Sequence, residues 1–144
     1  MCSIYDLVKE QEMCVADVDD NVMEVAQAMV ERNIGAVPVV REGRLAGVFS
    51  ERDLMRRIVV EGRDPHATKV GEVMTREPLS VSRNDDLEHC LVLMREHGFR
   101  HLPICEGERL LGFLSLRDLL LRDLSEKDDE VKLMRAYIHS APEL

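Results

Sequence analysis

Two short stretches carry the residues best suited to bind a ligand. "GVFSERD" (47–53) and "GFLSLRD" (112–118) both read Gly-apolar-apolar-Ser-x-Arg-Asp. An Asp carboxylate can accept two hydrogen bonds from the vicinal hydroxyls of a ribose. A helix that begins at the Ser offers free N–H groups and a partial positive charge to a phosphate. Arg52 and Arg117 fall in that first helical turn, which is a poor place for a cation unless an anion lies nearby. The motif therefore predicts a phosphorylated ligand.

A purely structural interpretation fits the same residues. Ser50 and Asp53 have the spacing of a helix N-cap with an acidic residue three positions later, and Ser115 and Asp118 repeat it. Such a pair satisfies the helix's own N–H groups without any ligand. Helix capping and ligand binding do not exclude each other, so both interpretations stay open.

The recurrence extends well beyond the motif. A shift of 65 residues aligns positions 14–54 with 79–119, where eleven of forty-one residues are identical without a gap. The shift superposes Pro38 on Pro103 and Gly47 on Gly112. Self-similarity at a fixed period is the signature of a duplicated structural unit.

Each copy predicts the same order of elements, β-α-β-β-α. The first has a short apolar segment (13–18), a helix and two strands at 36–40 and 45–50, and the second helix begins after Ser50. Helical spacing predicts that the core-facing residues of its first helix are Val22, Val25, Ala26, Met29 and Val30. A Gly-containing turn joins the strands as a hairpin. Pro38 within the first hairpin strand predicts an edge position or a local irregularity.

The second copy follows the same plan. Its segments are a short apolar stretch (78–83), two strands at 101–105 and 110–115, and a helix after Ser115. Its first helix presents Leu87, Cys90, Leu91 and Met94 at helical spacing. We therefore expect an α+β fold in which two repeats pack about a pseudo-twofold axis and form two equivalent clefts.

The remaining segments define the boundaries. We expect repeat 1 over 5–60, a linker with the start of repeat 2 over 61–77, repeat 2 over 78–125, and a C-terminal helix or tail over 126–144. Gly62 and Pro65 argue against a helix in the linker. The start of the chain forms a similarly short helical extension.

Together these features resemble a tandem pair of CBS domains, of the type found in stand-alone bacterial CBS-pair proteins. The resemblance rests on "RHLPI", "LSLRD" and "VMT", and on Gly-apolar-apolar-Ser-x-x-Asp occurring twice. It implies one Bateman module, which commonly forms a homodimer and binds adenosine-containing ligands: AMP, ADP, ATP, NAD(H) or S-adenosylmethionine.

The resemblance also implies roles for individual residues. Asp53 and Asp118 would bind the ribose hydroxyls, and Ser50 and Ser115 the ribose or phosphate. The adenine would lie against the second strand of each repeat, at Ala36, Val37, Pro38, His101, Leu102 and Pro103. Repeat 2 carries Arg100-His101 where repeat 1 has Gly35-Ala36, so we expect repeat 2 to supply the main phosphate-binding residues.

Composition narrows the class of function. A net charge of −9 and 3% aromatic residues argue against a nucleic-acid-binding protein. No apolar stretch approaches the ~18 residues of a membrane span, and the first residues do not resemble a signal peptide, so a cytoplasmic location is expected. No nucleophile–base arrangement or metal-ligand spacing occurs, so we expect neither an enzyme nor a metal site.

The sequence thus predicts a regulatory module that senses energy or redox state through an adenine nucleotide and modulates a separate, unknown partner. One alternative is a ligand-free CBS module used for dimerisation or interaction. A less favoured alternative is a redox or metal sensor based on Cys2, Cys14, Cys90 and Cys105.

Overall fold

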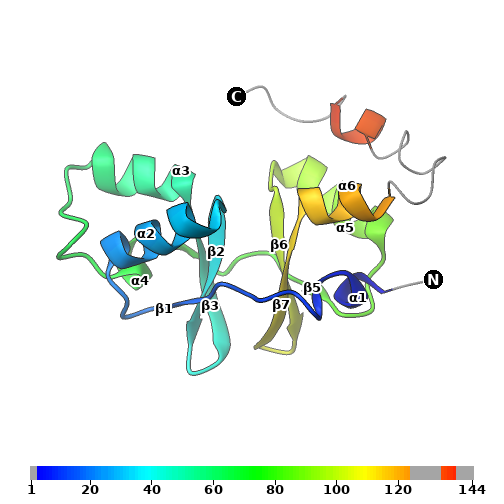
Figure 1. Ribbon diagram of the computed structural model, residues 1–144, viewed down its shortest axis with the longest axis horizontal. Coiled ribbons are helices and arrows are strands. Elements are labelled where there is room, and N and C mark those ends of the chain that lie inside the picture. Colours follow the sequence, from blue (N-terminus) through cyan, green and yellow to red (C-terminus); the bar gives the residue numbers. More distant parts are fainter. Residues whose placement is uncertain (1–2, 124–133, 139–144) are drawn as a thin grey trace. The chain divides into compact units, whose positions relative to one another are not determined.

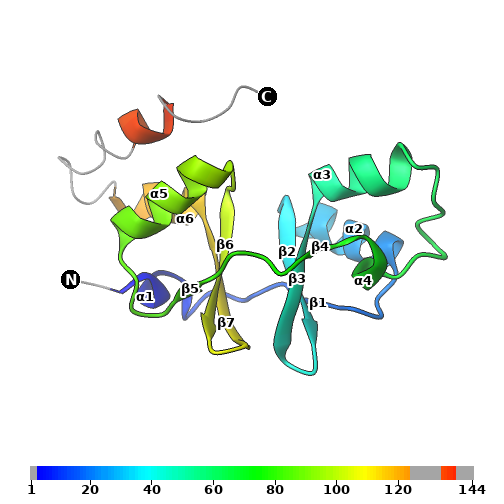
Figure 2. The same ribbon diagram turned by 180° about the vertical axis from the view of Figure 1, so that it is seen from behind.

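The chain forms two units, each with its own core. A computed structural model describes residues 3–123 and 134–138. Of these, the first-repeat unit contains 12–79 and 107–110, and the second-repeat unit contains 3–11, 80–106, 111–123 and 134–138. In each unit the helices lie on one side of the hairpin strands (Figures 1 and 2).

The first-repeat unit is a small mixed sheet covered by helices. Its strands are β1 (Ala16–Asp17), β2 (Ala36–Arg41), β3 (Arg44–Ser50) and β4 (Thr75–Arg76), in the order β1-β2-β3-β4. β1 pairs with β2 in parallel, and the other pairs are antiparallel. The helices are α2 (Val22–Arg32), α3 (Glu51–Asp53), the π-helix η1 (Leu54–Val59) and α4 (Val70–Val73).

The core of this unit is mostly aliphatic and follows the predicted α2 pattern at three positions. Val22, Val25 and Met29 are at most 5% exposed and pack around Phe49. Val30 is an exception, because 79% of it is exposed and it takes no part in the core. The prediction for Val30 was wrong: its helical spacing places it at the margin of the apolar stripe.

Pro38 does not mark an edge strand. β2 lies between β1 and β3, but β1 reaches only Val39 and Val40. The missing N–H of Pro38 therefore interrupts no pairing with β1. The alternative expectation, a local irregularity, is confirmed by a register shift between Val39 and Val40.

The second-repeat unit repeats the hairpin and its helices. It contains α1 (Ile4–Val8), β5 (Val81–Ser82), α5 (Leu87–His97), β6 (His101–Glu106), β7 (Arg109–Ser115) and α6 (Leu116–Asp123). β6 lies between β5 and β7. Cys90, Leu91 and Met94 of α5 are buried as the spacing predicts. The α+β fold with two similar repeats is thus present.

The segment at the start of each repeat packs in the unit of the other repeat. α1 stands at the start of repeat 1 in the sequence, yet Ile4 and Val8 lie in the core of the second-repeat unit. α4 and β4 lie in the segment 61–77 that leads into repeat 2, yet Val70 and Val73 lie in the core of the first-repeat unit. The expectation that the linker contains no helix was wrong, because α4 forms beyond Gly62 and Pro65, and β4 was not predicted.

The C-terminal prediction is tested in part. Residues 134–138 are helical, and Ala136 and Tyr137 pack against the core of the second-repeat unit. The rest of the predicted C-terminal helix lies outside the described residues. The short N-terminal helix corresponds to α1.

Candidate functional site

Both Ser-x-x-Asp motifs form the predicted helix caps. In repeat 1, Ser50 N–H donates to Asp53 Oδ2 at 2.9 Å, and Asp53 N–H donates to Ser50 Oγ at 3.2 Å. In repeat 2, the same bonds join Ser115 and Asp118 at 2.9 and 3.0 Å. In each pair the Ser hydroxyl also donates to the Asp carboxylate. These bonds align the first turns of α3 and α6.

Each Asp also accepts a hydrogen bond from a residue that the motif did not identify. Thr75 Oγ1 donates to Asp53 Oδ1 at 3.1 Å, and Gln11 Nε2 donates to Asp118 Oδ1 at 3.2 Å. Both donors follow the short helices that pack in the unit of the other repeat. Thr75 ends the "VMT" stretch on which the family resemblance rests, but no sequence pattern pairs it or Gln11 with an Asp, because the contacts depend on that exchange of segments.

The two carboxylates differ in how much acceptor capacity is left. Asp53 is only 7% exposed, and its Oδ1 also faces Arg57 Nε at 3.9 Å. Asp118 is half-buried, and among the described residues its Oδ1 accepts only the bond from Gln11. A carboxylate has about four acceptor positions. Asp118 therefore has more room for a ligand hydroxyl than Asp53.

Arg57 connects the first-repeat carboxylate to the linker. Its Nη1 donates to the carbonyls of Val73 and Met74, at 3.0 and 2.6 Å, where α4 ends. Arg57 lies in the π-helix η1, where the sequence predicted an ordinary helix. A cation at the C-terminal end of a helix also interacts favourably with its dipole. The Arg57 guanidinium therefore has a structural role in the first-repeat unit.

The residues before the second strand differ between the repeats as the sequence predicted. In both repeats the backbone carbonyl of this residue accepts a hydrogen bond from the first N–H of the helix that follows the hairpin. Leu116 N donates to Arg100 O at 2.8 Å, and Glu51 N donates to Gly35 O at 2.9 Å. A Cβ on Gly35 would lie 3.1 Å from Glu51 Oε1. In repeat 1 the Glu51 carboxylate therefore lies next to the backbone position that carries the Arg100 side chain in repeat 2.

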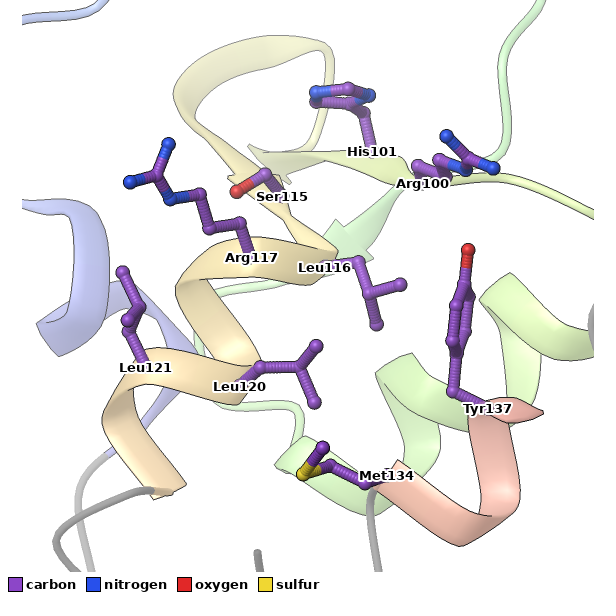
Figure 3. A pocket seen from close by; sticks show the side chains of 9 residues that line it. All are labelled: Arg100, His101, Ser115, Leu116, Arg117, Leu120, Leu121, Met134 and Tyr137. Carbon is purple, nitrogen blue, oxygen red and sulfur yellow. The ribbon is translucent and has the colours of Figure 1, made fainter.

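A cavity of about 500 Å³ opens beside this position in the second-repeat unit. Such a volume lies in the range of about 300–1,000 Å³ that is common for ligand pockets. The lining residues are Arg100, His101, Ser115, Leu116, Arg117, Leu120, Leu121, Met134 and Tyr137. Figure 3 shows Arg100, His101 and Ser115 along one rim, with Leu120 and Met134 at the other end. Among the described residues, the lining contains two arginines and no carboxylate.

Four predicted site residues thus share one cavity: Arg100, His101, Ser115 and Arg117. The His101 ring stacks on Phe113 with ring centres 5.2 Å apart. Asp118 does not line the cavity, but its carboxylate lies 2.8 Å from Ser115 Oγ.

The other predicted strand residues are buried. Val37 and Leu102 are at most 1% exposed and belong to the cores of their own units. Ala36, Pro38 and Pro103 are buried as well. Arg52 lies exposed in the first turn of α3.

Met134 and Tyr137 are lining residues that the sequence pattern did not identify. The sequence predicted a C-terminal helix or tail over 126–144, and nothing in its spacing indicated which surface it would cover.

The cysteines of the described residues have no ligand geometry. No group of three or more His, Cys, Asp or Glu residues within the described parts of the chain could hold a metal ion. Burial raises the pKa of the Cys90 thiol to about 12, and it also raises the pKa of Cys105. Such thiols are poor nucleophiles at neutral pH, because the reactive form is the thiolate.

Among the described residues, none of the helices is both long and apolar enough to cross a membrane.

Comparison with known proteins identifies the family. The family model for the CBS domain matches residues 5–60 and 70–125. The chain belongs to the CBS-domain family. It is 38% identical over 129 residues to the CBS domain-containing protein YhcV of Bacillus subtilis, covering 88% of this chain and 89% of that CBS protein.

Two plant CBS proteins are also similar. The mitochondrial protein CBSX3 of Arabidopsis thaliana is 34% identical over 125 residues, which are 83% of this chain and 61% of CBSX3, so the chain spans less than two thirds of its length. The structure of CBSX2 from the same plant in complex with AMP superposes with a TM-score of 0.77 at 25% identity, covering 88% of this chain and 99% of that one.

Proposed function

We propose that this CBS pair is a non-catalytic regulatory module that binds an adenine nucleotide on its second repeat. The observation that carries the proposal is the cavity at the start of α6, where Arg100 and Arg117 lie beside Ser115 and none of the described lining residues carries a carboxylate. The whole chain has a net charge of −9, but the two arginines make the potential in this cavity locally positive. An anion is therefore favoured there.

The adenosine part of the ligand is supported by two further points. Asp118 lies directly behind Ser115 and has acceptor capacity for a ribose hydroxyl. The related CBSX2 is known in complex with AMP. AMP, ADP, ATP, NAD(H) and S-adenosylmethionine share the adenosine group, and the first four also carry the phosphate that the arginines would bind.

The regulatory output goes to a separate partner. Binding changes the module's behaviour only if the nucleotide has different affinities for two arrangements of the protein. In this proposal the module responds to the energy or redox state of the cell. Homodimerisation, the packing of the repeats about a pseudo-twofold axis and a cytoplasmic location stay predictions.

Titration calorimetry and thermal unfolding with the five ligands test the proposal. A ligand that binds the native state raises the unfolding midpoint. Replacing Arg100 with Ala should weaken AMP binding by about tenfold or more, because it removes a charged contact to phosphate.

Arg117→Ala should weaken AMP binding for the same reason. Arg52→Ala is its matched control, since Arg52 occupies in repeat 1 the position of Arg117 in repeat 2. It should leave the affinity unchanged. If none of the five ligands binds at millimolar concentration, the nucleotide-binding proposal is wrong and a ligand-free interaction module is favoured.

A further inference from the structure

One wall of the cavity comes from outside the CBS domains. Met134 and Tyr137 line it, whereas the family model ends at residue 125. Both residues belong to the helical segment 134–138, which groups with the second-repeat unit. This wall therefore lies outside the residues that the CBS family model matches.

The wall is anchored rather than loosely placed. Ala136 and Tyr137 pack against the core that contains Leu116 and Leu119 of α6. Tyr137 is half-buried, whereas Ile138 is 68% exposed. The segment thus presents Tyr137 to the cavity and leaves Ile138 outside it.

The cavity has an apolar part and a basic rim, and the Tyr137 side chain borders both. In Figure 3 its ring stands opposite Leu116 and Leu120, and its hydroxyl end points toward Arg100. An apolar space bounded by an aromatic ring and two leucines lies next to a basic rim. A flat aromatic group fits the first part and a phosphate fits the second.

We propose that Tyr137 is a binding residue that stacks on the base of the nucleotide, so that the C-terminal segment completes the site. This rests on the proposed function. With the phosphate at the Arg100 rim and the base on Tyr137, the ribose lies between them, beside Ser115 and the Asp118 carboxylate behind it. Stacking on Tyr137 also makes occupancy of the site favour the docked position of the segment.

Three substitutions at one position separate stacking from simple packing. Tyr137→Phe keeps the aromatic face and should bind AMP as the unchanged protein does. Tyr137→Leu fills much of the same space without a ring, and Tyr137→Ala removes it. Both should weaken binding by about 5- to 150-fold, the range expected for loss of one base–aromatic stack. Ile138→Ala, on the same segment but outside the cavity, is the matched control and should not change the affinity.

Limited proteolysis gives an independent readout. Arg135 is exposed on the segment and is a trypsin site. Saturating AMP should slow cleavage after Arg135 in the unchanged protein and in Tyr137→Phe, but not in Tyr137→Leu.

The outcomes are distinguishable. If AMP binds and Tyr137→Leu binds it equally well, the stacking role is overturned while the proposed function stands. If the unchanged protein binds none of the adenine ligands, both are overturned together. Weaker binding by Tyr137→Leu with unchanged binding by Tyr137→Phe supports the inference.

Discussion

At the scale of single residues, Asp53 and Asp118 occupy the same motif position but differ in their surroundings. Both cap a helix through the preceding Ser. Asp53 is buried and also accepts from Thr75, beside Arg57, whereas Asp118 is half-buried and accepts from Gln11. The same residue type therefore has a mainly structural role in repeat 1 and a candidate binding role in repeat 2.

This difference predicts that replacing the Asp with Asn affects mainly stability in repeat 1 and mainly AMP binding in repeat 2. Asp53→Asn should lower the free energy of unfolding by about 1–3 kcal/mol, because it disturbs a buried hydrogen-bonded carboxylate. Asp118→Asn should lower it less but weaken AMP binding. Urea denaturation and titration calorimetry on both variants measure the two effects. Equal loss of stability with no change in binding would show that Asp118 only caps α6.

The Cys90 thiol predicts a pH dependence of stability. Its pKa is raised from 9.0 to about 12, mainly by burial. Between these values the folded protein keeps a proton that the unfolded chain loses, so the free energy of unfolding falls as pH rises above about 9. Urea denaturation between pH 8 and 10.5 should show a steeper fall for the unchanged protein than for Cys90→Ala. Cys14→Ala is the control and should keep the steep fall.

At the scale of the elements, the glycine that opens the repeated motif is explained by the short segments that pack against each hairpin. A Cβ on Gly47 would lie 2.5 Å from the carbonyl oxygen of Thr75 in β4. A Cβ on Gly112 would lie 2.8 Å from a methyl group of Val8 in α1. In the first-repeat unit β4 therefore lies close to β3, and in the second-repeat unit α1 lies close to β7.

The kind of atom met at each glycine predicts the cost of replacing it. Gly47→Ala meets a backbone carbonyl held in a strand pair, and should cost about 3 kcal/mol of stability. Gly112→Ala meets the end of a side chain that can shift, and should cost about 1 kcal/mol. Thermal or urea unfolding of the two variants compares them directly. A larger loss for Gly112→Ala would contradict this account.

At the scale of the whole molecule, the two repeats are similar in fold but differ in the residues around their Ser-x-x-Asp motifs. Repeat 1 places the Glu51 carboxylate beside Gly35, and its buried Asp53 accepts a hydrogen bond from Thr75. Repeat 2 has Arg100 and Leu116 at the corresponding positions, and Met134 and Tyr137 of the C-terminal segment line its cavity. The duplication thus provides one scaffold twice, with a basic cavity on the second copy.

This inequality predicts one nucleotide bound per chain. Titration calorimetry with AMP should give a stoichiometry of one, and Arg100→Ala should reduce the same binding event. A stoichiometry of two with similar affinities would show that repeat 1 binds despite Glu51.

Much of the fold could be predicted because it depends on local patterns. The repeat, the hairpins and both caps follow from turn residues and from apolar periodicity, as in Val22, Val25 and Met29 of α2. The place of Pro38 in β2 and the exposure of Val30 could not be predicted. The first depends on how far β1 extends along β2. The second depends on whether another element covers the margin of the apolar stripe of α2, where Val30 lies. The residue's own neighbours in sequence carry no information about either.

The candidate site divides in the same way. The sequence by itself determined the family-like motif, the capping residues, and the presence of Arg100 and His101 in repeat 2 alone. Only the tertiary structure decided that Thr75 and Gln11 donate to the two carboxylates, that Glu51 lies beside Gly35, and that Tyr137 lines the basic cavity. The physical reason is that these contacts join segments far apart in the chain or side chains whose direction is set by packing, whereas capping and periodicity act over only a few residues.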